Sequence, residues 1–152
     1  MTTPHATVAI AAAVFNRRGD ILLIQRGRPP GVGLWSLPGG KLHAFESLAA
    51  GVAREVREET GLDVDVGPHI AVIERMVQPS ATDATAPFHY VIIDYLARLR
   101  QPDAQPRADD DALDARFVPR ADIDILPITD GLGSIVQAAW QRAVELGWVE
   151  AS

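Results

Sequence analysis

The chain contains no cysteine among its 152 residues. Disulfide bonds, thiolate nucleophiles and zinc sites built from cysteine are therefore excluded. No uninterrupted apolar run reaches the roughly 18 residues that a membrane-spanning helix requires. The apolar stretch near the N-terminus lacks a preceding basic segment, so we interpret it as a strand and not as a signal peptide. We therefore expect a cytoplasmic protein without a membrane partner.

Basic residues are outnumbered by acidic ones. Lysine and arginine total 14 against 20 aspartates and glutamates, which gives a formal net charge of −6. A protein that binds nucleic acid polymers usually presents a basic face, so no such partner is expected. A small nucleotide is still compatible with this charge, because a bound cation can bridge acidic side chains and phosphate.

The chain is a succession of strand-like and helix-like segments. Strands are predicted at 6–16, 21–26, 62–77, 88–100 and 112–118, and the first two form a hairpin around Gly19. Helices are predicted at 46–60 and 131–148, with one helical turn within 119–130. Their inward candidates are Leu48, Val52, Val56, Ile135, Ala139 and Val144. We expect one domain over residues 1–152, of the α/β (α+β) class, with helices layered on a sheet.

Two short stretches depart from this regular pattern. Residues 27–40 hold three prolines and five glycines, which predicts a long shaped loop. The helix that follows carries Glu55, Glu58 and Glu59 on one patch, where like charges repel. Arg54 and Arg57 could make this an ordinary solvated surface. However, the preceding Pro-Gly-Gly turn can expose backbone to a ligand. Carboxylates with a backbone carbonyl form an all-oxygen site that suits Mg²⁺ or Mn²⁺.

Residues 40–62 carry a motif that resembles the Nudix box. Every fixed position of that motif is met, by Gly40, Glu46, Arg54, Glu55, Val56, Glu58, Glu59, Gly61 and Leu62. Many relatives place a glycine before the first glutamate, where this chain has Phe45. The resemblance implies an αβα sandwich with a mixed central sheet, and a homodimer is compatible with it. The wider pattern is similar to short bacterial MutT-like and ADP-ribose-pyrophosphatase-like proteins.

The resemblance also implies roles for individual residues. Glu55, Glu58 and Glu59, with the Gly39 carbonyl, would hold Mg²⁺ or Mn²⁺ against a diphosphate. Arg54 would position these carboxylates, and Glu46, expected in the first helical turn, would anchor the loop together with the structural Gly40 and Gly61. The general base would be Glu55 or an acid on a later loop. The candidates on that loop are Asp109, Asp110, Asp111 and Asp114.

Substrate contacts are expected from two sets of side chains. Basic groups near the glycine-rich loop could bind phosphate, and these are Arg26, Arg28 and Lys41. Aromatic side chains could contact the base, and these are Trp35, Phe88, His89 and Tyr90. Each aromatic residue could equally pack in the core. His43 and His69 have no second ligand at metal spacing and are interpreted as surface residues.

Three functions are compatible with these features. The first is metal-dependent cleavage of a nucleoside diphosphate derivative such as ADP-ribose or a related nucleotide sugar. The second is a MutT-type pyrophosphohydrolase that cleaves nucleoside triphosphates, including oxidised ones. The third is a nucleotide-binding sensor without catalysis, which the complete set of box glutamates disfavours.

Overall fold

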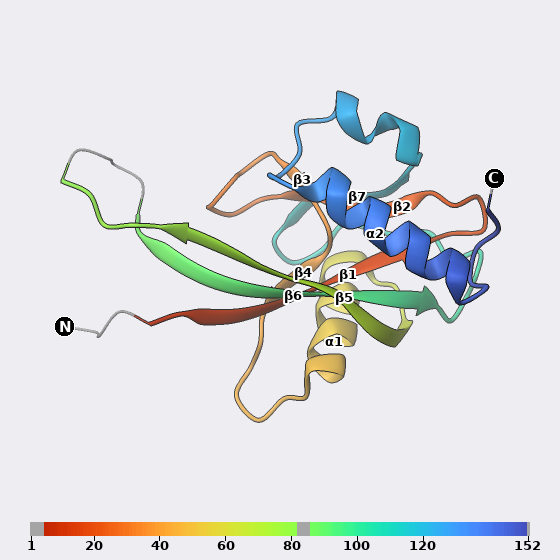
Figure 1. Cartoon of the computed structure of the whole chain (residues 1–152), viewed down its shortest axis with the longest axis horizontal. Coiled ribbons are helices and arrows are strands. Elements are labelled where there is room, and N and C mark those ends of the chain that lie inside the picture. Colours follow the sequence, from red (N-terminus) through yellow and green to blue (C-terminus); the bar gives the residue numbers. More distant parts are fainter. Residues whose placement is uncertain (1–4, 82–85, 152) are drawn as a thin grey trace.

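The computed structural model describes residues 5–81 and 86–151 (Figure 1). The described strands are β1 (Thr7–Phe15), β2 (Ile21–Arg26), β3 (Trp35–Ser36), β4 (Gly39–Lys41), β5 (Val64–Val77), β6 (Phe88–Leu99) and β7 (Ala112–Val118). The helices are α1 (Leu48–Thr60), α2 (Leu132–Glu145) and the 3-10 helix η1 (Arg120–Ile125). No helix in the described ranges is long and apolar enough to cross a membrane.

The sheet is mixed and runs in the order β3-β2-β1-β6-β5, while β4 pairs with β1 and β7 pairs with β2. Only the β1–β6 pair is parallel among the described strand pairs, in register from Thr7↔Tyr90 to Phe15↔Arg98. The predicted hairpin is confirmed, since β1 and β2 pair antiparallel at Phe15↔Ile21. β4 takes the other end of the same edge of β1, at Ala9–Ala11. β2 and β4 therefore separate from one another, and the sheet opens between them.

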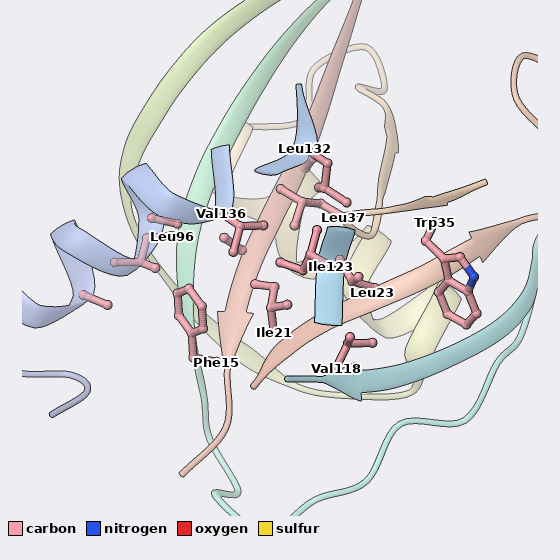
Figure 2. Packing of buried hydrophobic residues seen from close by; sticks show 14 residues of the cluster. Phe15, Ile21, Leu23, Trp35, Leu37, Leu96, Val118, Ile123, Leu132 and Val136 are labelled. Carbon is pink, nitrogen blue, oxygen red and sulfur yellow. The ribbon is translucent and has the colours of Figure 1, made fainter. Parts of the chain in front are cut away.

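The core lies on both faces of the sheet, because successive side chains of a strand point to opposite faces. Ile10, Ala12 and Val14 pack with the α1 residues Val52 and Val56. On the other face, Ala11, Ala13 and Phe15 pack with α2 residues that include Val136 and Ala139 (Figure 2). β1 is buried on both sides, which explains its continuous apolar sequence. This three-layer arrangement confirms the α+β class.

The structure corrects several predicted boundaries. The region 27–40 is not all loop, because β3 and the start of β4 lie within it. Helix α1 begins at Leu48, since Ser47 caps it and accepts a hydrogen bond from the Ala50 amide. Glu46 therefore precedes the helix and does not lie in its first turn. On α2, Val144 is only partly buried and Ala143 takes the expected inward place.

Candidate active site

Strand β4 places two glycines, which have no side chain, against helix α1. A Cβ atom on Gly39 would lie 2.2 Å from the Ile10 carbonyl oxygen, so only glycine permits this approach to β1. The Gly39 amide donates a 2.7 Å hydrogen bond to Oε1 of Glu59. A Cβ atom on Gly40 would lie 2.6 Å from Oε1 of Glu55. The two glycines thus bring β4 into direct contact with the two buried glutamates of α1.

Arg54 resolves the crowding of like charges on α1. Its Nε and Nη2 donate to both carboxylate oxygens of Glu46, at 2.6 and 2.9 Å. Its Nη1 donates to Glu55 at 2.7 Å and to Glu58 at 3.1 Å, and Nη2 also donates to the Lys41 carbonyl. One guanidinium therefore orients three carboxylates, since charge-assisted bonds to arginine are directional as well as strong.

The box carboxylates lie in different electrostatic environments. Burial raises the pKa of Glu59 to about 8, against the hydrogen bond from Gly39. Burial also raises the pKa of Glu55, against the bond from Arg54. Glu46 behaves oppositely, because its hydrogen bonds from Arg54 and His43 lower its pKa to about 2. Burial thus disfavours the ionised forms of Glu55 and Glu59, and a bound cation would stabilise those ionised forms.

The donor set on α1 fits an oxygen-preferring divalent cation. Glu55 and Glu59 are 8% and 5% exposed, and Glu59 has no hydrogen-bonded cationic partner among the described residues. Within residues 5–81 and 86–151, no three carboxylates or imidazoles converge closely enough to enclose a metal ion. Arg54 holds Glu58 and Glu55 in this arrangement. Carboxylate oxygens are ligands that Mg²⁺ and Mn²⁺ prefer, so the side chains on α1 suit such an ion. In the present arrangement these carboxylates do not surround an ion completely.

A cavity of about 760 Å³ lies beside the glutamates, where the sheet opens. Glu55, Glu58 and Glu59 form one wall, with Gly39 and Gly40. The remaining wall comes from the loop after β2, the sheet face of β5 and β6, the loop ending at Asp111 and the start of α2. This volume lies within the range of small-molecule sites.

The acidic loop before β7 is tied to α1. The amides of Arg107 and Asp109 donate to the carbonyls of Thr60 and Glu59, which occupies carbonyls that the last turn of a helix leaves free. Asp110, at a positive φ of 52°, lines the cavity, and its charge contributes to the raised pKa values of Glu55 and Glu59.

The other acids of this region have protein partners. Asp111 lines the cavity but binds Arg28 at 2.8 Å. Asp114 lies within β7, inside the predicted strand 112–118, so counting it among the loop acids was wrong. It binds Arg116 and does not line the cavity. The Asp109 carboxylate accepts a bond from the Asp110 amide. Among these loop acids, Asp110 is thus the one whose charge acts on both Glu55 and Glu59.

Of the predicted substrate-contact residues, five line the cavity and two do not. Arg26, Arg28 and Lys41 all line the cavity, and Arg26 is held there by its bond to the Pro30 carbonyl. Phe88 and Tyr90 also line it, with their rings 5.4 Å apart.

Two of the expected aromatic contacts need correction. Trp35 is 3% exposed in the core, with the Arg116 guanidinium over its ring, so it does not offer a face to a base. His89 points to the other face of β6, where it binds Glu74 at 2.7 Å. The alternation of a strand, in which neighbours point to opposite faces, could have separated His89 from Phe88 and Tyr90.

Asp94 and Arg75 are cavity residues that the sequence analysis did not identify. Asp94 follows Phe88, Tyr90 and Ile92 at intervals of two on β6, and all four line the cavity. An aspartate within the apolar run "YVIIDYL" was the signal that could have revealed it, since buried strands rarely carry a charge.

Comparison with known proteins identifies the family. Residues 5–139 match the family model of the NUDIX domain. The chain belongs to the NUDIX family. A MutT NUDIX hydrolase from Burkholderia pseudomallei has the same fold, with a TM-score of 0.70 and 28% identity over 88% of this chain and 98% of that chain. The NUDIX domain of NrtR from Shewanella oneidensis, solved with ADP ribose, shows the fold at a TM-score of 0.72, with 22% identity over 92% of this chain and 90% of that one.

Curated NUDIX relatives match a shorter region. The CTP pyrophosphohydrolase of Escherichia coli is 39% identical over 71 residues, or 46% of this chain and 53% of that protein. A putative 8-oxo-dGTP diphosphatase 2 of Mycobacterium tuberculosis is 40% identical over 79 residues, or 51% of this chain and 53% of that protein. The chain thus spans about half the length of these curated relatives.

Proposed function

We propose that this NUDIX protein hydrolyses the diphosphate linkage of a nucleoside diphosphate derivative, such as ADP-ribose or a related nucleotide sugar, with Mg²⁺ or Mn²⁺. The observation that carries the proposal is the pair of buried carboxylates, Glu55 and Glu59, that share a cavity with bare glycine backbone. The missing Cβ atoms of Gly39 and Gly40 leave room for Ile10 and for the Glu55 carboxylate, so the β4 backbone lies directly beside the two glutamates.

The protein's residues divide the work. Glu55, Glu58 and Glu59, with the Gly39 backbone, would hold the cation, which when bound would neutralise phosphate charge and acidify the attacking water. Arg54 fixes the directions of Glu55 and Glu58. Arg26 and Lys41, on the cavity wall, would contact phosphate oxygens that face away from α1.

The chemical step is attack by water on one phosphorus of the diphosphate. A new P–O bond forms, the bridging P–O bond breaks, and the leaving phosphate carries away the bond's electron pair. The water proton passes to a carboxylate, and among the acids that line the cavity the two candidates are Glu55 and Asp110. A general base must come within hydrogen-bond reach of that water, directly or through one further water.

A nucleoside triphosphate is the second candidate substrate. Its support is the similarity to the CTP pyrophosphohydrolase and the putative 8-oxo-dGTP diphosphatase. The same carboxylates and glycines would serve either substrate, because both contain a diphosphate linkage.

A substrate panel with product identification tests the proposal. The purified protein is incubated with Mg²⁺ and ADP-ribose, nucleotide sugars or nucleoside triphosphates in oxygen-18-labelled water, and products are weighed by mass spectrometry. AMP plus ribose 5-phosphate supports the first substrate class, and a monophosphate plus pyrophosphate supports the second. The label identifies the phosphorus that was attacked. Tight nucleotide binding without any hydrolysis would refute catalysis and favour the sensor function.

A further inference from the structure

Phe88 and Tyr90 are aromatic residues that the hydrophobic core does not use. Most aromatic side chains of the chain, among them Trp35, Tyr95 and Phe117, pack in or against the two clusters of buried residues. Phe88 and Tyr90 belong to neither cluster, are only partly buried and line the cavity. Ligand cavities are commonly lined by aromatic side chains, so these two rings are available for a ligand and not required by the core.

The two rings are neighbours on one face of the sheet. Phe88 and Tyr90 are two residues apart on β6, so their side chains point to the same face. Their ring centroids lie 5.4 Å apart, with an angle of 38° between the ring planes. Together they offer a ligand a broader aromatic surface than either ring would offer alone.

The cavity around this aromatic surface is largely apolar. Further apolar residues of β5, β6 and α2 line the cavity, and these are Ile73, Ile92, Leu132 and Ile135. Arg75 pairs with Tyr90 across the two strands and donates a hydrogen bond to the Asp130 carbonyl, which bounds the site between β5 and the start of α2. Apolar walls of this kind contact a planar group through its faces more than through its hydrogen-bonding edge.

Lys41 places a phosphate-binding group on the same face of the sheet. It pairs with Ala9 of β1, and Ala9 pairs with Ile92 of β6, on strands that lie side by side (Figure 1). Paired residues of adjacent strands point to the same face, so Lys41 shares its face with Ile92 and Tyr90. Two strand spacings of about 4.8 Å separate the Cα atoms of Lys41 and Ile92, and Tyr90 lies about 7 Å further along β6. A nucleotide with its diphosphate beside Lys41 would extend its base toward Tyr90.

We propose that Phe88 and Tyr90 form the base-binding subsite of the cavity, in which the base of the nucleotide substrate stacks on their rings. The inference rests on the proposed function in taking the ligand to be a nucleotide, and it adds where and how its base is bound. One base stacked on an aromatic side chain gains roughly 5- to 150-fold in affinity.

Stacking also predicts which bases are accepted. Every base has an aromatic face, so stacking tolerates different hydrogen-bonding edges. Purines have two fused rings and a larger face than pyrimidines, so AMP and GMP should bind similarly and CMP more weakly. The subsite therefore favours purine nucleoside diphosphate derivatives, a class that includes ADP-ribose.

Calorimetric titration with AMP and ribose 5-phosphate in Mg²⁺ separates the base from the phosphate. Each ligand carries one phosphate on a ribose, and neither contains a diphosphate linkage that the protein could cleave. The wild type should bind AMP at least about fivefold more tightly than ribose 5-phosphate, which is the lower limit for one stacked base. Tyr90→Ala should lower the affinity for AMP by at least about fivefold and leave the affinity for ribose 5-phosphate unchanged. Tyr90→Phe keeps the ring and should bind AMP as the wild type does.

His89→Ala is the matched control for the alanine variant. His89 precedes Tyr90 on β6 but points to the opposite face, where it pairs with Glu74, so both affinities should be unchanged. Circular dichroism verifies that each variant folds. Tyr90→Leu, which keeps an apolar side chain without a ring, replaces the alanine variant if that variant does not fold.

Several results would overturn the inference. If the wild type binds AMP no more tightly than ribose 5-phosphate, it is overturned whether or not the variants fold. An unchanged AMP affinity in Tyr90→Ala, or equal losses for both ligands, would overturn it as well. A difference of more than about tenfold between AMP and GMP would show that the edge of the base is read, against stacking. CMP binding as tightly as AMP would also count against stacking.

The outcomes separate this inference from the proposed function. If Tyr90→Ala loses affinity for AMP alone, the inference stands, even if no nucleotide is hydrolysed and the proposed function fails. Hydrolysis of ADP-ribose by a protein whose AMP affinity does not depend on Tyr90 would support the proposed function and overturn the inference.

Discussion

Replacing Glu59 by glutamine should stabilise the metal-free protein while removing its activity. The side chain is 5% exposed, and its pKa is raised to about 8 in the folded protein from an ordinary 4.5. At pH 7, folding must therefore either bury the charge or bind a proton. The cost is about 1.4 kcal/mol for each pH unit between 4.5 and 7, or about 3 kcal/mol.

Glutamine avoids this cost but introduces an amide that needs partners. Its oxygen can still accept the Gly39 amide hydrogen, whereas an unpaired amide donor would cost about 1–3 kcal/mol. The difference is a net gain of up to about 2 kcal/mol at pH 7, or a melting temperature higher by up to about 8 °C for a protein of this size.

The dependence on pH is the sharper test. Because the folded protein binds the Glu59 proton more tightly than the unfolded chain, wild-type stability falls as pH rises from about 4.5 to about 8. Urea unfolding in EDTA at several pH values should show the advantage of Glu59→Gln growing across that range. Glu145→Gln, an exposed glutamate on α2 that pairs with Arg142, is the control and should show no such growth. An advantage that stays constant or shrinks as pH rises would refute the reasoning.

Three further predictions concern catalysis. Exhaustive EDTA treatment should abolish turnover and added Mg²⁺ or Mn²⁺ should restore it, so full activity in EDTA would exclude a metal-dependent mechanism. Asp110→Asn should lower kcat by at least about tenfold with little change in KM, while Asp114→Asn should not; equal and normal kcat in both would leave Glu55 as the base. Gly40→Ala should reduce kcat/KM and lower the melting temperature, because the added Cβ would lie 2.6 Å from a Glu55 oxygen; unchanged activity and melting temperature would show that α1 can shift to accept it.

The sequence was sufficient to predict the elements whose signals are local. The apolar stripe on α1 and the strand patterns of β1, β2 and β6 depend on residue spacing, which a chain reveals by itself. The same is true of the box motif, because its residues lie within one loop and one helix. The chain's membership of the NUDIX family follows from that short region and from the match to the family model over residues 5–139.

Other features were decided by contacts between distant segments. Trp35 and Tyr90 are both aromatic residues near predicted loops, yet one is buried in the core and the other lines the cavity. The difference arises because β3 pairs with β2 while β6 pairs with β1. No local pattern specifies such pairings, since they depend on how the whole sheet assembles.

The environments of the acids show the same division. The sequence placed Glu46, Glu55 and Glu59 in one motif, but tertiary packing gave Glu46 the two bonds of Arg54 and left Glu59 with one backbone amide. Asp94 carried no motif, and its isolation depends on which residues of β1, β5 and α2 surround it. Sequence therefore determined which groups are available for chemistry, and the tertiary structure determined how strongly each is desolvated, because burial depends on all the segments packed around a side chain.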